Sequence, residues 1–224
     1  MPDPEFEIYP RKLRDVFDPA TPEFNAILVR LSVLFEDLRI EEYGSRIERI
    51  EELDVVGKTY RQIYFVRRSI ASLVEFAGAI EMLDQRPEFR KIKAKAASHV
   101  RERWDGAVEY FRNWKDYLRA RRGDFGAHFD HGPNLHAVRE MNPEMEGELV
   151  VVKNHEEKTG GVRLKYAYQI VSAAMTHRKP TDQSEAEWFR EMFIIVRAGT
   201  QETVKAVHSL SLMYLLEKFG REMD

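Results

Sequence analysis

The chain has 224 residues, of which 43% are hydrophobic and 33% are charged, and its formal net charge is −3. This composition excludes a disordered chain, which combines low hydrophobicity with a strong charge imbalance. The near-neutral total argues against a protein that is basic over its whole surface. The absence of cysteine excludes disulfides, thiolate zinc sites, iron–sulfur clusters and cysteine nucleophiles. Because no secretory signal and no bilayer-length apolar stretch is visible, we expect a cytoplasmic protein.

The first elements in the chain are an irregular arm and a helix. Residues 1–20 carry four prolines and no sustained periodicity, which indicates the arm. Residues 21–224 are predicted to form a single domain. Its first helix has Thr21 as N-cap and Pro22 at the first helical position, and it ends near Gly44. Apolar residues three and four apart predict its buried face: Phe24, Ile27, Leu28, Leu31, Leu34, Phe35 and Leu38.

Two further helices follow in the first half of the chain. The capping-box pattern that begins at Ser45 predicts a second helix, which ends near Gln85 and has Gly57 as a candidate kink or break. Pro87 opens a third helix that continues to about Arg121, a rod of roughly 50 Å at about 1.5 Å per residue. Gly123 is well placed to terminate it. His99 falls beside the apolar stripe of this helix, which favours a core or interface position.

The second half of the chain contains the one clear β signal. Residues 149–152 are rich in β-branched side chains, and apolar positions alternate over residues 162–168, so a hairpin is predicted at about 148–168 with residues 153–161 as its loop. A helical segment around residues 169–178 follows. A second capping box at Ser184 predicts a long terminal helix, with Gly199 as a candidate bend or break.

These elements predict an all-α fold. It would be an antiparallel bundle of four to five long helices with a small β-hairpin insertion. The wide, aromatic-rich stripes are explained as its core.

The local charge differs strongly from the average. Residues 86–122 carry twelve Lys or Arg against five Asp or Glu, a charge of +7, whereas the rest of the chain carries −10. This charge has two interpretations. In the first, the helix tracks phosphates or attracts an anionic substrate. In the second, it is a solvated face whose charges pair with acidic neighbours on adjacent helices. The side chains that we select as phosphate-binding candidates are Arg112, Lys115, Arg119 and Arg121.

The basic segment ends in the sequence RGDFGAH, which contains Arg122, Asp124 and His128. An Arg at a helix end, followed at this spacing by Ala and His, resembles the motif of the HEPN superfamily of helical-bundle proteins. The family usually has a polar residue where this chain has Gly123. The resemblance covers mainly residues 45–131 and implies metal-independent RNA cleavage in a cleft formed by two copies of the domain. It assigns His128 as general acid or base and Arg122 as phosphate stabiliser, with Asp124 orienting His128 or capping the following helix.

Other interpretations of the chain remain open. The densest group of potential metal ligands is His128, Asp130, His131 and His136, which favours a weaker hypothesis of a divalent-metal site. No sequence motif calls for a cofactor. A second hypothesis is a non-catalytic oligomerisation or protein-interaction module. The expected partners are a second copy of the chain, RNA, or another protein.

Overall fold

The protein is described here from a computed structural model. It describes residues 12, 16–46, 55–125, 135, 139, 149–153, 160–164, 173, 175–176 and 179–219, and the statements below concern these residues. Most of them are helical. The helices are α2 (Pro22–Arg46), α3 (Val55–Asp84), α4 (Pro87–Lys95), α5 (Ser98–Phe125) and α8 (Glu185–Phe219). The prediction of an all-α fold is therefore confirmed.

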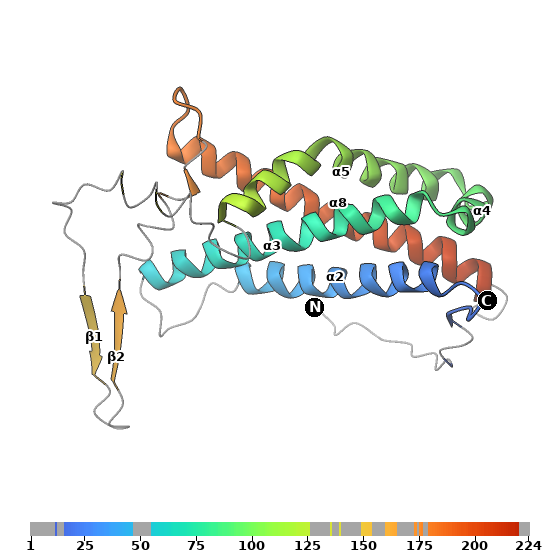
Figure 1. The fold of residues 1–224 in the computed structure, drawn as a ribbon, viewed down its shortest axis with the longest axis horizontal. Coiled ribbons are helices and arrows are strands. Elements are labelled where there is room, and N and C mark those ends of the chain that lie inside the picture. The colour runs from blue at the N-terminus through green and yellow to red at the C-terminus, as the bar shows by residue number, and fades with distance from the viewer. Residues whose placement is uncertain are drawn as a thin grey trace, which may run out of the picture.

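The four long helices α2, α3, α5 and α8 lie side by side and alternate in direction, with the short α4 at one end (Figure 1). α3 contacts α2, α5 and α8, and α5 packs along α8. The core is rich in large side chains that are almost fully buried, among them Phe76, Phe89, Trp104 and Phe111. The rings of Phe89 and Trp104 lie 4.6 Å apart, and those of Phe76 and Phe111 lie 5.4 Å apart. The predicted stripes on these helices are thus core.

The predicted starts of two helices are confirmed. α2 begins at Pro22, and the carbonyl of Thr21 accepts the first helical hydrogen bond, from the amide of Asn25 at 3.0 Å. At α8, Ser184 and Glu187 form the predicted capping box: the Ser184 amide donates to Glu187 Oε2 at 2.9 Å, and the Glu187 amide donates to Ser184 Oγ at 3.3 Å. The capping box predicted at Ser45 does not start a helix there. Ser45 lies in the last turn of α2, and its hydroxyl donates to the Glu42 carbonyl.

The prediction of one continuous helix from Pro87 to about Arg121 is wrong. α4 ends at Lys95, Ala96 is extended, and α5 begins at Ser98. Asp84 gives a physical reason, since its Oδ1 accepts from Lys93 Nζ at 3.0 Å and from Trp104 Nε1 at 2.8 Å. A straight rod would hold these two residues, one on α4 and one on α5, about 16 Å apart along its axis.

Two glycines do not interrupt helices as predicted. α5 continues through Gly123 to Phe125, and α8 is unbroken at Gly199. In the first case Asp124 pairs with Arg121 one turn earlier, which extends the helix past the glycine. In the second case Gly199 meets the buried Leu73 side chain of α3, so its role is close packing.

Two short strands lie between α5 and α8 in the chain. β1 (Leu149–Lys153) and β2 (Gly160–Leu164) pair antiparallel, with Leu149 opposite Leu164 and Lys153 opposite Gly160. Residues 154–159 and 165–172 lie outside the described residues, as do residues 1–11 of the predicted arm. The end of the arm is fixed at Val16, whose carbonyl accepts from Tyr214 Oη of α8 at 2.6 Å.

Candidate functional site

Arg122 lies in the last turn of α5 and points to α3. Its Nη1 is 2.8 Å from Oε1 of Glu75, and its side chain is 44% exposed. Glu75 also forms an ion pair with Arg30 of α2. The Arg122 guanidinium is therefore at the surface, in a cluster that joins α2, α3 and α5.

Asp124 is buried and belongs to a different cluster. Its Oδ2 accepts from Arg121 Nη1 at 3.0 Å, and only 2% of Asp124 is exposed. The Arg121 guanidinium lies 4.2 Å from the ring centre of Trp188 on α8 and 5.0 Å from that of Tyr117. The structure thus places Arg122 toward solvent and Asp124 toward the core, and it does not bring the two side chains together.

The remaining motif residues lie outside the described residues. These are His128 and the other members of the proposed metal cluster, Asp130, His131 and His136. Convergence of Arg122 and His128 therefore stays a prediction, and so does the metal hypothesis. Within the described part of the chain, no group of three or more potential ligands is arranged to hold a metal ion.

The four phosphate-binding candidates on α5 have different environments. Arg121 is buried as described above, and Lys115 forms an ion pair with Glu81 of α3. Arg112 and Arg119 are exposed, and neither has a hydrogen bond or ion pair to another described residue. They are seven residues apart, so they share one face of α5 two turns from each other. Within the described residues, acidic neighbours therefore neutralise part of the basic segment, and the rest has no ionic partner.

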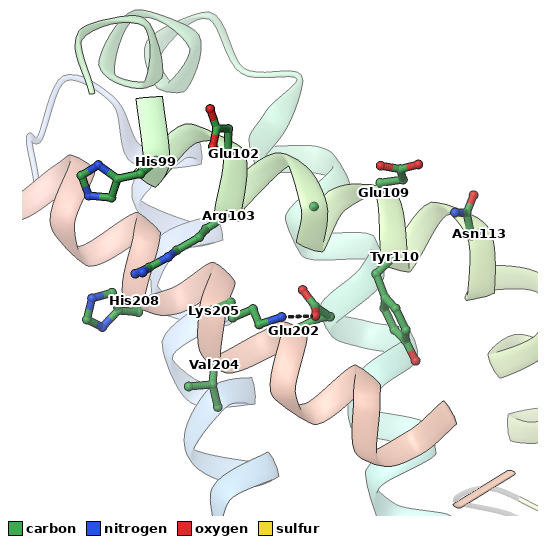
Figure 2. A pocket seen from close by; sticks show the side chains of 11 residues that line it. His99, Glu102, Arg103, Glu109, Tyr110, Asn113, Glu202, Val204, Lys205 and His208 are labelled. Carbon is green, nitrogen blue, oxygen red and sulfur yellow. Dashed lines mark hydrogen bonds and ion pairs between the residues drawn. The ribbon is translucent and has the colours of Figure 1, made fainter. Parts of the chain in front are cut away.

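A groove of about 910 Å³ runs between α5 and α8 (Figure 2). α5 contributes seven of its residues and α8 contributes four. Lys205 Nζ and Glu202 Oε1 form an ion pair at 2.6 Å along the α8 side. Burial raises the pKa of Tyr110 well above its ordinary value. The Tyr110 phenol is therefore a neutral donor, and it binds the Ile195 carbonyl at 2.5 Å. The lining residues are His99, Glu102, Arg103, Gly106, Glu109, Tyr110, Asn113, Glu202, Val204, Lys205 and His208.

Sequence reasoning did not find this groove. The sequence predicts a core or interface position for His99, but His99 is exposed at the groove wall. The spacing of His99 and Arg103, one helical turn apart, was a usable local signal. His208, which lines the same groove, is far away in sequence. It reaches the same groove only because α8 packs along α5.

No family model matches this sequence, and no curated protein and no solved structure is significantly similar to it. Over the described residues, no helix has both the length and the apolar character that crossing a membrane requires.

Proposed function

We propose that this chain is an HEPN-like cytoplasmic protein that binds RNA or another phosphate-bearing partner and cleaves RNA without a metal ion. The proposal rests on the HEPN-like spacing of Arg122 and His128 at the end of a basic helix in an all-α bundle. The observation that carries the binding part is the pair of exposed arginines on α5, Arg112 and Arg119, which have no partner among the described residues.

Exposed arginines that lack a partner among the described residues favour a phosphate backbone as the ligand. A guanidinium binds phosphate oxygens through two parallel hydrogen bonds, and binding releases the counterions of the nucleic acid. Arg112 and Arg119 are about 10 Å apart along the helix axis, which spans a few successive nucleotides. This face of α5 leads directly to Arg122, so a bound strand would extend toward the motif.

Arg122 is available for this chemistry despite its ion pair with Glu75. Exposed ion pairs contribute only about 0–1 kcal/mol, and a phosphate group competes effectively for such an arginine. His128 would transfer the proton to or from the ribose 2′-hydroxyl or the leaving oxygen. Asp124 takes a supporting role here, because its buried pairing with Arg121 holds the end of α5 that carries Arg122.

Cleavage is tested with RNA in the presence of a chelator. We expect cleavage that survives the chelator and is lost in Arg122→Ala and in His128→Ala, both verified to be folded by circular dichroism. Chelator-sensitive cleavage would instead support the metal hypothesis for His128, Asp130, His131 and His136. Cleavage that persists in both folded variants would exclude the assigned residues.

Binding is tested separately, by the salt dependence of RNA affinity. The double variant Arg112→Gln/Arg119→Gln should weaken binding and reduce the slope of log affinity against log salt by roughly one to two. The matched control, Arg39→Gln/Lys91→Gln, removes the same charge from α2 and α4. An equal loss in the control would mean that only the total charge matters, and RNA binding by this face would be excluded.

A second candidate function, a non-catalytic oligomerisation module, is favoured by the outer face of α2. Ala26, Val29, Val33, Glu36, Ile40 and Tyr43 follow one another at alternating spacings of three and four, and all are exposed. The four large apolar members are 46–71% exposed. Such a heptad stripe is the seam of a coiled coil. Like the HEPN-like nuclease, which the resemblance places in a cleft between two copies, this candidate is a homodimer. Unlike the nuclease, it needs no catalysis.

A second copy of α2 in antiparallel orientation fits this seam best. With Val29 opposite Ile40 of the second copy, Glu36 faces Val33 and not another Glu36, and Arg30 faces Asp37. A parallel arrangement would place the two Glu36 carboxylates together. Sedimentation velocity should show a dimer that dissociates in Val33→Glu/Ile40→Glu but persists in the control Ile194→Glu, which alters an exposed residue of α8. A monomeric wild-type protein would exclude the interface.

A further inference from the structure

We propose that the groove between α5 and α8 binds a small phosphate monoester, with His99, Arg103 and His208 holding the phosphate. This site is separate from the Arg112–Arg119 face and the Arg122 motif, and it concerns a small molecule and not RNA. It therefore stands or falls independently of the proposed nuclease.

The phosphate end of the groove is defined by three nitrogen-bearing side chains that have no partner among the described residues. His99 and Arg103 are one turn apart on α5, and His208 faces them from α8. All three are exposed, and none makes a hydrogen bond or ion pair with another residue that the structure describes. Figure 2 shows the Arg103 guanidinium extended toward α8, between the two imidazoles in this view. An arginine and two histidines together offer several N–H donors to phosphate oxygens.

Arg103 is the cation at this end of the groove, and the carboxylates around it are either paired or directed away from it. Glu202 is paired with Lys205, so its charge is locally compensated. The carboxylates of Glu102 and Glu109 point away from α8 in Figure 2. A divalent cation is disfavoured at this end, since the Arg103 guanidinium lies between the two imidazoles that would be its ligands.

The remainder of the groove has room for the organic part of such a ligand. From His99 to Asn113 the α5 wall extends about 20 Å, and the volume of about 910 Å³ is within the usual range for small-molecule sites. At Gly106 a Cβ atom would meet nothing within 4 Å, so the middle of the wall is open. Tyr110 supplies aromatic surface beyond it, and Asn113 supplies an amide at the far end. Val204 adds apolar surface on the α8 wall, near Lys205. The order of these surfaces along the groove, from the phosphate end to Asn113, suits a phosphate monoester with a nucleoside-sized organic part.

The phosphate end is tested by isothermal titration calorimetry of the full chain with adenosine monophosphate and with inorganic phosphate. We expect binding of both, and a loss of about tenfold or more in affinity for both in Arg103→Gln and in the double variant His99→Gln/His208→Gln. The matched control Lys91→Gln removes one exposed charge from α4 and should bind like the wild type. Equal weakening in the control, or no binding by the wild type, would overturn the proposal.

The body of the ligand is tested with Gly106→Leu, which fills the middle of the groove. Because the wall is open there, the variant should fold, and it should lose adenosine monophosphate while still binding inorganic phosphate. Retained nucleotide affinity in this variant would overturn the placement of the ligand along α5. Gly78→Ala serves as the control for a changed helix glycine, because its added Cβ also meets nothing within 4 Å.

Discussion

Arg121 and Asp124 form a buried ion pair one turn apart at the end of α5, with Arg121 Nη1 3.0 Å from Asp124 Oδ2. The side chains are only 9% and 3% exposed. The guanidinium also stacks on Trp188, which carries the contact from α5 to α8. Asp124 of the sequence motif, together with the preceding Arg121, therefore also holds α5 against α8, and this structural role can be separated from that of Arg122 by mutation.

Breaking this pair should destabilise the fold strongly. In Arg121→Ala the Asp124 carboxylate stays buried without its compensating charge, and such changes cost about 3–5 kcal/mol. Arg121→Lys keeps the charge but loses the planar stacking on Trp188, so we expect an intermediate loss. Urea unfolding measures both. A double-mutant cycle with Asp124→Ala should show strong coupling; additive effects would mean that the two side chains do not act as a pair.

Removing Arg122 should affect stability little. Its pair with Glu75 lies at the surface, and exposed pairs contribute about 0–1 kcal/mol. We expect the free energy of unfolding of Arg122→Ala to fall by less than about 1 kcal/mol. Glu75→Gln is the complementary variant, because it frees both Arg122 and Arg30 and should increase RNA affinity. A large loss of stability in Arg122→Ala would show that loss of activity in this variant reports folding and not chemistry.

The parts of the fold that depend on local chemistry were predictable from the sequence. Pro22 begins α2, Ser184 and Glu187 form their capping box, and the periodic stripes are buried, because caps and helix faces are set by residues within a few positions. The break at Ala96 was not predictable in this way. The apolar repeat continues across it, and the turn depends on Asp84 of the preceding helix binding Lys93 and Trp104.

The candidate sites also depend partly on local sequence and partly on contacts between helices. The basic segment and the Arg122 motif are visible as sequence, but which arginines are free depends on carboxylates of other helices, such as Glu75 and Glu81 of α3. The groove depends on His208 reaching the wall formed by His99 and Arg103, and this follows from helix packing alone. Sequence therefore locates the basic helix, and tertiary contacts decide which of its side chains are available.

Glu41 should make stability fall as the pH rises. It is 6% exposed, accepts from Ser72 Oγ at 2.9 Å and has Arg68 Nε at 3.8 Å. Burial raises its pKa above the ordinary value of 4.5, despite the opposing effects of Ser72 and Arg68. The folded state therefore holds this proton more tightly than the unfolded state. The stability that Glu41 contributes is present below the unfolded pKa and is lost as the pH rises through the folded one.

Glu41→Gln tests this sign. The amide keeps an acceptor for Ser72 and carries no charge, so we expect a higher melting temperature at neutral pH and a flatter profile between acid and neutral pH. The control Glu36→Gln alters a side chain of α2 that is 62% exposed and should leave the profile unchanged. A lower melting temperature for Glu41→Gln at neutral pH would show that the ion pair with Arg68 outweighs the cost of burial.

Gly199 and Gly78 should respond oppositely to the same substitution. At Gly199 of α8, an added Cβ would lie 2.9 Å from Cδ1 of Leu73, which is fully buried on α3. Because Leu73 is surrounded by the core and has little room to shift, Gly199→Ala should destabilise the protein by about 1–3 kcal/mol. At Gly78 a Cβ meets nothing within 4 Å, so Gly78→Ala should stabilise by about 0.4–1 kcal/mol through the loss of unfolded-state freedom. Thermal and urea unfolding compare the two variants. If Gly199→Ala stabilises as much as Gly78→Ala, then helix propensity governs both positions, and the close packing of α8 on α3 at Leu73 is not what requires glycine there.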